Sequence, residues 1–198
     1  MIEISRDGGL YRVTVREQSR APADDVYDLL ADLRTHMEWG GSWHPSKTQR
    51  LQAMSAPEGP ATVGVEFCST GTTSAGSWND RSRVTEARRP ALFQFVTDGV
   101  LQDGQGEARM SLNAIHRYEL ATNEVTEVTY SLVAQLTLHK PPGDQHPRLP
   151  AVIFNLVVPA VIERGLRNLV RMAEERMSPV PAATGAVPTD PPPGSGAR

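Results

Sequence analysis

Cysteine is almost absent from this sequence, with Cys68 the only one among 198 residues. A lone cysteine cannot close a disulfide within the chain, which excludes the small secreted folds that disulfides hold together. We expect Cys68 to be a small buried apolar side chain. Long apolar runs are also lacking: none reaches 18 residues, and residues 1–10 have no signal-peptide apolar region. We therefore expect no membrane span and a cytoplasmic location.

A large excess of charge of either sign is missing too. The chain has 20 Lys and Arg residues against 23 Asp and Glu residues, a net charge of -3 at pH 7. Its isoelectric point is about 6.0. Nucleic-acid-binding proteins usually carry a basic face and a high isoelectric point. The balance of charge therefore argues against a nucleic-acid partner.

The familiar catalytic motifs are not found either. The chain has no GxSxG, HExxH, Walker or dinucleotide-binding glycine motif, so it lacks the signature of the common hydrolases and nucleotide enzymes. Its five histidines are His36, His44, His116, His139 and His146. None of them forms a compact set with Cys68 at the spacing that zinc sites use. We expect neither a metal nor another cofactor.

Proline, in contrast, is plentiful and unevenly placed. Six of the 16 prolines lie in residues 178–198, a segment without aromatic residues and without Leu or Ile. Such a segment buries too little apolar surface to offset the entropy of ordering it, so we expect a disordered tail. The rest of the chain is predicted to be one domain over residues 10–177, preceded by an N-terminal extension of residues 1–9.

The spacing of apolar residues predicts an ordered series of elements. Residues 10–18 alternate between apolar and polar side chains, which is typical of a half-buried strand. Val26, Leu29, Leu30 and Leu33 share one helical face, and a second short helix is expected to carry Trp39. Further strands are predicted at residues 48–54, 62–70, 78–87, 92–97, 110–120 and 125–138, with 92–97 closed by Asp98-Gly99. A long helix that ends at Met177 is predicted, and Pro159 is expected either to kink it or to mark its start.

The two longest predicted strands, residues 110–120 and 125–138, each have one apolar face. That face of the first strand includes His116 and Tyr118, and that of the second includes Tyr130. Period two with polar neighbours is typical of an antiparallel meander with one buried face. We expect an α+β fold in which a curved antiparallel sheet of about six or seven strands surrounds the C-terminal helix, with two short helices after the first strand.

This order of elements resembles the START-related SRPBCC superfamily, which has the helix-grip fold and whose bacterial members are often labelled polyketide cyclase/dehydratase-like. The resemblance covers residues 10–177. It is carried by the segment VTVREQSRAPADDVYDLLADL, Trp39, the stretches 78–95 and 118–130, and residues 165–174. It implies a cavity between the sheet and the long helix that accepts a small hydrophobic or aromatic ligand, polyketide-like or lipid-like. Fold resemblance alone does not establish chemistry.

The residues expected to bind such a ligand fall into two groups. Those at the mouth flank Gly40-Gly41 and are Trp39, Trp43 and His44. Those in the interior are Glu66, Trp78, Phe95, Leu112, Leu132, Phe154, Val158 and Ile162. Glu66 contributes only if it points inward, and glutamate is rarely buried. Asp80, Arg81 and Arg83 are interpreted as a solvated strand face.

Three functions remain open from the sequence. The leading hypothesis is ligand binding by a carrier. The alternative is a polyketide cyclase, aromatase or dehydratase in which His116 acts as the acid or base, and Tyr118 and Tyr130 orient an enolate. These three side chains are equally compatible with a packed core. A second alternative is a protein-interaction module that uses the apolar residues 151–158.

Overall fold

The computed structural model describes residues 1–7, 9–42, 49–73, 76–139 and 158–177. Within these ranges the chain forms an antiparallel sheet of eight strands in the order β1-β2-β8-β7-β6-β5-β4-β3. The strands are β1 (Ile2–Asp7), β2 (Leu10–Ser19), β3 (Gln49–Ser55), β4 (Glu66–Thr73), β5 (Gly76–Arg88), β6 (Leu92–Gln102), β7 (Ala108–Thr122) and β8 (Thr126–Leu138). The helical elements are α1 (Ala23–Ala31), η1 (Leu33–Thr35), η2 (Met37–Ser42) and α3 (Val158–Met177).

The expectation of an α+β fold with a C-terminal helix is confirmed, but the predicted number of strands is too low. One additional strand is β1, which lies in the stretch that we expected to be an extension. It pairs with β2 at the edge of the sheet, with Ile2 opposite Val15 and Ile4 opposite Val13. All six residues of β1 are exposed. A strand of this kind buries little, so it leaves a weak pattern in the sequence.

Strand β6 is longer than predicted because it continues through Asp98-Gly99, which we expected to end it. Asp98 pairs with Arg81 on one side and with Asn113 on the other. The side-chain amide of Asn113 also donates a hydrogen bond to Asp98 Oδ1 over 2.7 Å. Pairing on both sides of the strand therefore overrides the local turn signal.

The helices after β2 begin where the sequence indicates. Helix α1 starts directly after Pro22 and buries Val26, Leu29 and Leu30 against the sheet. The second short helix is a 3-10 turn, η1, followed by the π-helical turn η2, which carries Trp39. The Thr35 hydroxyl donates to the carbonyl oxygen of Leu29 over 2.6 Å and so ties this connection to α1.

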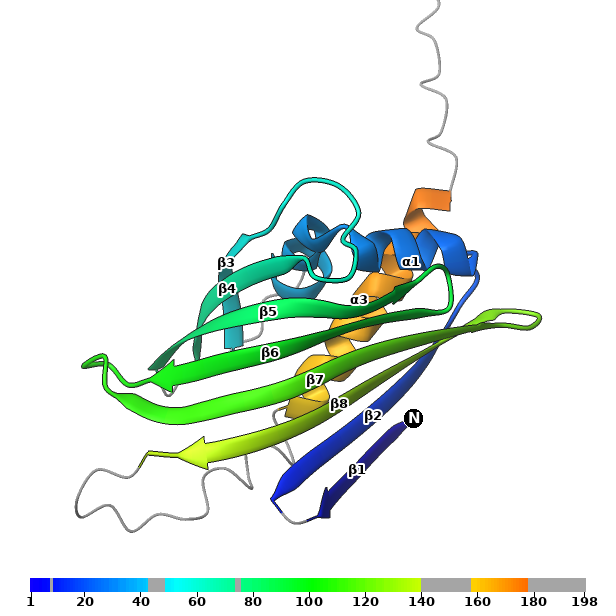
Figure 1. Cartoon of the computed structure of the whole chain (residues 1–198). Coiled ribbons are helices and arrows are strands. Elements are labelled where there is room, and N and C mark those ends of the chain that lie inside the picture. Colours follow the sequence, from blue (N-terminus) through cyan, green and yellow to red (C-terminus); the bar gives the residue numbers. More distant parts are fainter. Residues whose placement is uncertain (8, 43–48, 74–75, 140–157, 178–198) are drawn as a thin grey trace, which may run out of the picture.

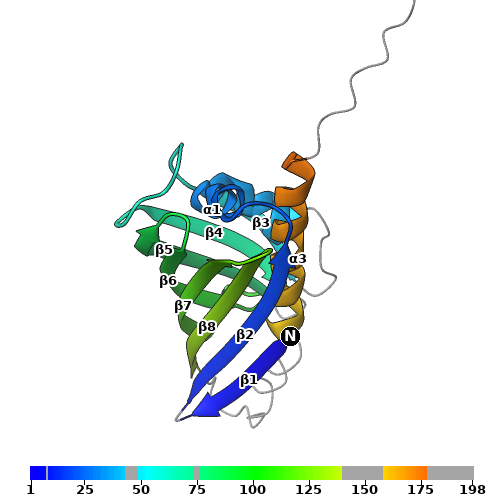
Figure 2. The same ribbon diagram turned by 90° about the vertical axis from the view of Figure 1, so that its right-hand side faces the viewer.

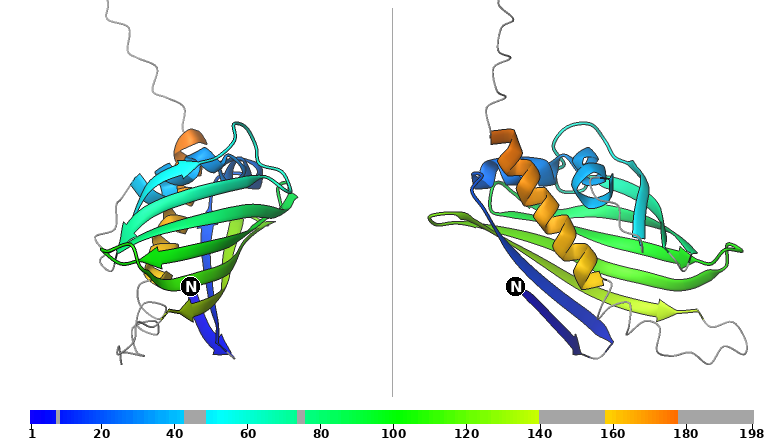
Figure 3. Two further views of the ribbon diagram at one scale, coloured as in Figure 1. Left: turned by 60° about the vertical axis from the view of Figure 1, so that its left-hand side comes forward. Right: turned by 180° about the vertical axis from the view of Figure 1, so that it is seen from behind.

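Helix α3 lies across the concave face of the curved sheet, and α1 covers one end of the same face (Figures 1 and 2). Seen from behind, α3 runs diagonally over the strands (Figure 3). The core between these layers includes Phe93, Leu30 and Leu169, which have no exposed surface. Pro159, for which a kink or a helix start was expected, lies in the first turn of α3. The helices in the described ranges include none that is long and apolar enough to cross a bilayer.

Cys68 is exposed, so the expectation of a buried thiol is wrong. Its neighbours Phe67 and Ser69 are buried, and a strand turns successive side chains to opposite faces. The predicted tail, residues 178–198, lies outside the described residues.

Candidate functional site

The register of the sheet brings the predicted aromatic and polar residues together on its concave face. In one row Phe95 of β6, His116 of β7 and Leu132 of β8 lie opposite one another. In the next row Tyr118 and Tyr130 lie opposite each other. The period-two pattern of β7 and β8 predicted this shared face, and the antiparallel pairing aligns the residues across it.

His116 and Tyr130 form a hydrogen-bonded pair at the centre of this face. The Nδ1 atom of His116 lies 2.7 Å from the Tyr130 hydroxyl oxygen. The imidazole stacks on the ring of Phe95, with centroids 4.5 Å apart and planes 12° from parallel. Tyr118 packs beside Tyr130 with ring centroids 4.6 Å apart. The pair therefore lies in an aromatic setting in which its rings have defined orientations.

Burial keeps both members of the pair uncharged. It disfavours the imidazolium and, with a smaller effect of the nearby His36, lowers the pKa of His116 from 6.5 to about 3. Burial also raises the pKa of Tyr130 well above its ordinary value. At neutral pH the phenol can therefore donate to Nδ1 of a neutral imidazole, whose other nitrogen then carries the hydrogen.

Tyr130→Phe is expected to lower the free energy of unfolding by about 1–2 kcal/mol, because it leaves Nδ1 of His116 without this partner. Urea unfolding at pH 7 measures the loss. The control is Tyr27→Phe at another buried tyrosine (4% exposed), for which no hydrogen-bond partner is found in the described part of the chain. Equal losses in the two variants would contradict a specific contribution from the pair.

Trp39 lies at the junction of η2, α3 and the sheet. It is buried, and its ring packs edge-on against Tyr118 with centroids 6.3 Å apart. Its indole nitrogen donates to the Thr35 hydroxyl over 3.2 Å. The side-chain amide of Asn168 in α3 donates to the Trp39 carbonyl oxygen over 3.0 Å. Trp39 is thus a fixed wall of the interior.

His36 is a buried residue to which the sequence analysis assigned no role. Only 5% of it is exposed, and its Nε2 atom lies 2.9 Å from the Leu30 carbonyl oxygen. Burial lowers the pKa of His36 to about 4, although the hydrogen bond to Leu30 opposes this shift. The centroids of the His36 and Trp39 rings lie 4.5 Å apart. A polar residue inside a short helical connection gives no periodic signal, so only the packing identifies it.

Two further polar pairs lie on the concave face, and the sequence analysis predicted neither of them. Asp80 accepts hydrogen bonds from the Ser69 backbone nitrogen over 3.1 Å and from the Ser69 hydroxyl over 2.7 Å. Burial raises the pKa of Asp80, so its interpretation as solvated is wrong. In the next row the Ser82 and Thr97 hydroxyl oxygens lie 2.8 Å apart and are buried. The sequence offered one signal for this burial: Asp80 and Ser82 alternate along β5 with the exposed Arg81 and Arg83.

Apolar side chains on the same face are only half-buried next to these polar pairs. Leu112 and Leu136 lie opposite each other on β7 and β8, and Val158 and Ile162 lie on α3. Trp78 is half-buried on β5, where its ring lies so close to Gly71 that a Cβ there would overlap it. With one exception, the predicted interior residues in the described ranges thus lie either on the concave face of the sheet or on α3, which lies across it.

The exception is Glu66, which is exposed and forms an ion pair with Arg81 on the outer face. The expectation that it binds ligand is therefore wrong, because β4 directs Phe67 inward instead. Trp43, His44, Phe154 and residues 151–157 lie outside the described residues. The described residues include no group of three or more His, Cys, Asp or Glu side chains that could hold a metal ion.

Known proteins resemble this chain in structure but not in sequence. No protein-family model matches the sequence, and no curated protein matches it. Ginseng major latex-like protein 151 from Panax ginseng has a TM-score of 0.53 and 10% identity, covering 84% of this chain and 99% of that one. A Thermus thermophilus protein has a TM-score of 0.56 and 14% identity, with 84% and 99% covered. A Rhizobium leguminosarum protein has a TM-score of 0.56 and 11% identity, with 88% and 99% covered. These likenesses show a shared fold.

The shared fold extends over almost the whole of each of these proteins. At 10–14% identity it transfers no residue roles. The argument for function therefore rests on the side chains of the concave face.

Proposed function

We propose that the protein binds a small hydrophobic or aromatic ligand between the sheet and α3, as a START-related helix-grip carrier would. The supporting observation is that Leu112, Leu136, Val158 and Ile162 are only half-buried while they pack against the core that contains Phe95, Tyr118 and Tyr130. Trp78 is half-buried on β5 as well. Apolar side chains that a fold leaves accessible on a concave face are typical of ligand sites. The polar atoms of His116 and Tyr130 would orient a ligand carbonyl or hydroxyl.

Binding is favoured over catalysis by the state of His116. An effective general acid or base has a pKa near the working pH. A pKa of about 3 means that about one imidazole in ten thousand is protonated at pH 7. The same low pKa makes the neutral ring a weak base. The residue is therefore better suited to hydrogen bonding than to the proton transfers of a cyclase or dehydratase.

The proposal is tested with N-phenyl-1-naphthylamine, an uncharged aromatic probe whose fluorescence rises in apolar surroundings. We expect saturable binding of one probe per chain. Leu112→Trp places a larger ring on the concave face and is expected to weaken binding by about tenfold or more. Its matched control is Ile115→Trp, on the outer face of the same strand, where 38% of the side chain is exposed. This control is expected to stay within about twofold of the unsubstituted protein.

Two results would contradict the proposal: the absence of saturable binding, or an equal loss of affinity in both tryptophan variants. Circular dichroism and thermal unfolding of the two variants establish that each is folded before titration. Native mass spectrometry of the protein purified from its own host adds an independent measurement. A co-purified small molecule at one per chain is the expected result, and a clean mass of the bare chain argues against the proposal.

A further inference from the structure

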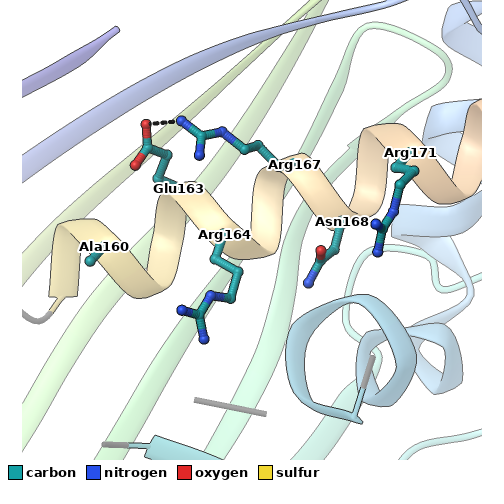
Figure 4. A pocket seen from close by; sticks show the side chains of 6 residues that line it. All are labelled: Ala160, Glu163, Arg164, Arg167, Asn168 and Arg171. Carbon is teal, nitrogen blue, oxygen red and sulfur yellow. Dashed lines mark hydrogen bonds and ion pairs between the residues drawn. The ribbon is translucent and has the colours of Figure 1, made fainter. Parts of the chain in front are cut away.

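A hollow lies along α3 (Figure 4). It has a volume of about 460 Å³, large enough for a small organic molecule. The described residues that line it all come from α3 and are Ala160, Glu163, Arg164, Arg167, Asn168 and Arg171. Leu166 and Leu169, which pack into the core, lie on other sides of the helix. The hollow is therefore separate from the concave face proposed above to bind the hydrophobic ligand.

The lining carries an excess of positive charge, with three guanidinium groups against one carboxylate. Two of the guanidinium groups already have carboxylate neighbours. Arg167 forms ion pairs with Glu163 and, over 3.0 Å, with Glu17 of β2. Arg171 lies 3.8 Å from Glu175. These contacts neutralise part of the positive charge of the two side chains.

Arg164 differs from both. It is exposed, and its guanidinium has no ion-pair or hydrogen-bond partner among the residues that the structure describes. Figure 4 shows Arg164, Asn168 and Arg171 extending from one side of α3, whereas the paired Glu163 and Arg167 extend from the other. Asn168 is buried (7% exposed) and donates to the Trp39 carbonyl oxygen, which fixes this side of the helix against η2.

We infer that this hollow binds a small organic molecule through an oxyanion group, a phosphate or a carboxylate, held by Arg164. A guanidinium offers parallel N–H donors that match two oxygens of such a group. Arg171 adds positive charge on the same side of α3. This inference does not depend on the ligand of the concave face.

Nuclear magnetic resonance titration with phenyl phosphate tests the inference. We expect saturable shifts of the Arg164 Nε–H signal and of the backbone amides of residues 160–171. Arg164→Gln is expected to weaken binding about tenfold, because a charge-assisted hydrogen bond is lost. Arg176→Gln removes the same charge from an exposed position on the same helix, outside the hollow, and is expected to change the affinity less than about twofold. Arg164→Lys, which keeps the charge, should lie between the two.

Benzyl alcohol and inorganic phosphate complete the experiment. The uncharged alcohol should leave residues 160–171 unshifted, and inorganic phosphate should bind more weakly than phenyl phosphate. The inference is overturned if phenyl phosphate gives no saturable shift at these residues. It is also overturned if the two glutamine variants weaken binding equally, or if inorganic phosphate binds as tightly as phenyl phosphate. None of these outcomes bears on binding of the uncharged naphthylamine at the concave face, so the two proposals can fail separately.

Discussion

Acidification from pH 7 to pH 4 is expected to lower the free energy of unfolding by about 3 kcal/mol through His36 alone. The pKa of His36 falls from 6.5 in the unfolded chain to about 4 in the folded protein, because its buried ring disfavours the charged form. The unfolded state therefore takes up a proton first as the pH falls. The stabilisation is complete above pH 6.5 and is lost as the pH falls towards 4.

His116 acts in the same direction, because its pKa is lowered as well. Loss of stability between pH 6.5 and pH 4 should therefore be steep. Asp32, whose pKa is lowered chiefly by a hydrogen bond from Arg34, adds a contribution at still lower pH. The aromatic cluster is thus expected to come apart in mild acid, and ligand binding at the concave face should be lost with it.

His36→Gln separates this effect from the general response to acid. The glutamine amide can still donate to the Leu30 carbonyl oxygen but does not titrate. The free energy of unfolding is measured by urea unfolding, followed by tryptophan fluorescence, from pH 7.5 to pH 4. Over this range the variant should lose about 3 kcal/mol less of it than the unsubstituted chain. His139→Gln, at an exposed histidine, is the control and should leave the pH dependence unchanged. Parallel curves for the His36 variant and the unsubstituted chain would refute the prediction.

Phe93→Ala is expected to lower the free energy of unfolding by about 3–5 kcal/mol, since it removes a large side chain from a closed core. Phe93 has no exposed surface. Its ring meets Tyr27 of α1 edge-on at 6.0 Å and Phe95 at 6.3 Å. It therefore joins the layer formed by α1 to the floor of the candidate site, and its loss should loosen both.

The measurement is urea unfolding at pH 7, with the probe titration repeated on each variant. Val96→Ala, on the same strand but half-buried, serves as the matched control and should cost about 1 kcal/mol or less. If the alanine variant does not fold, Phe93→Leu, which retains most of the volume, should lose about 1–2 kcal/mol. A loss for Phe93→Ala no larger than that for Val96→Ala would show that the ring does not bridge the two layers.

Much of the fold could be predicted because its signals are local. Alternation along β7 and β8 follows from the geometry of a strand and needs no knowledge of its neighbours. Pro22 before α1 and the apolar stripe of α3 are equally local. The predicted strands were wrong where pairing with a neighbouring strand determines the structure. Strand β1 forms by pairing with the edge strand β2. Strand β6 continues through Asp98-Gly99 because β5 and β7 both pair with it there.

The candidate site, too, was predictable from the sequence only in part. The shared face of His116, Tyr118 and Tyr130 was predictable, because residues two apart on a strand point to the same side. The outward direction of Glu66 and the burial of Asp80 were not. The local sequence around a lone carboxylate is the same whether its side chain points to the buried or to the exposed face of the strand. Only the packing of β4 against β5 decides which face is covered.

The sequence by itself determined the order of the elements, the concave face of the long hairpin and the long amphipathic helix, since each is a periodic property of a continuous segment. Only the tertiary structure decided that His116 meets Tyr130, that His36 is buried, that Ser69 meets Asp80, and that Arg164 is left without a partner among the described residues. The physical reason is that hydrogen bonds, desolvation and charge depend on atoms brought together across strands and helices. Spacing along one strand or helix cannot encode which side chain faces it from another.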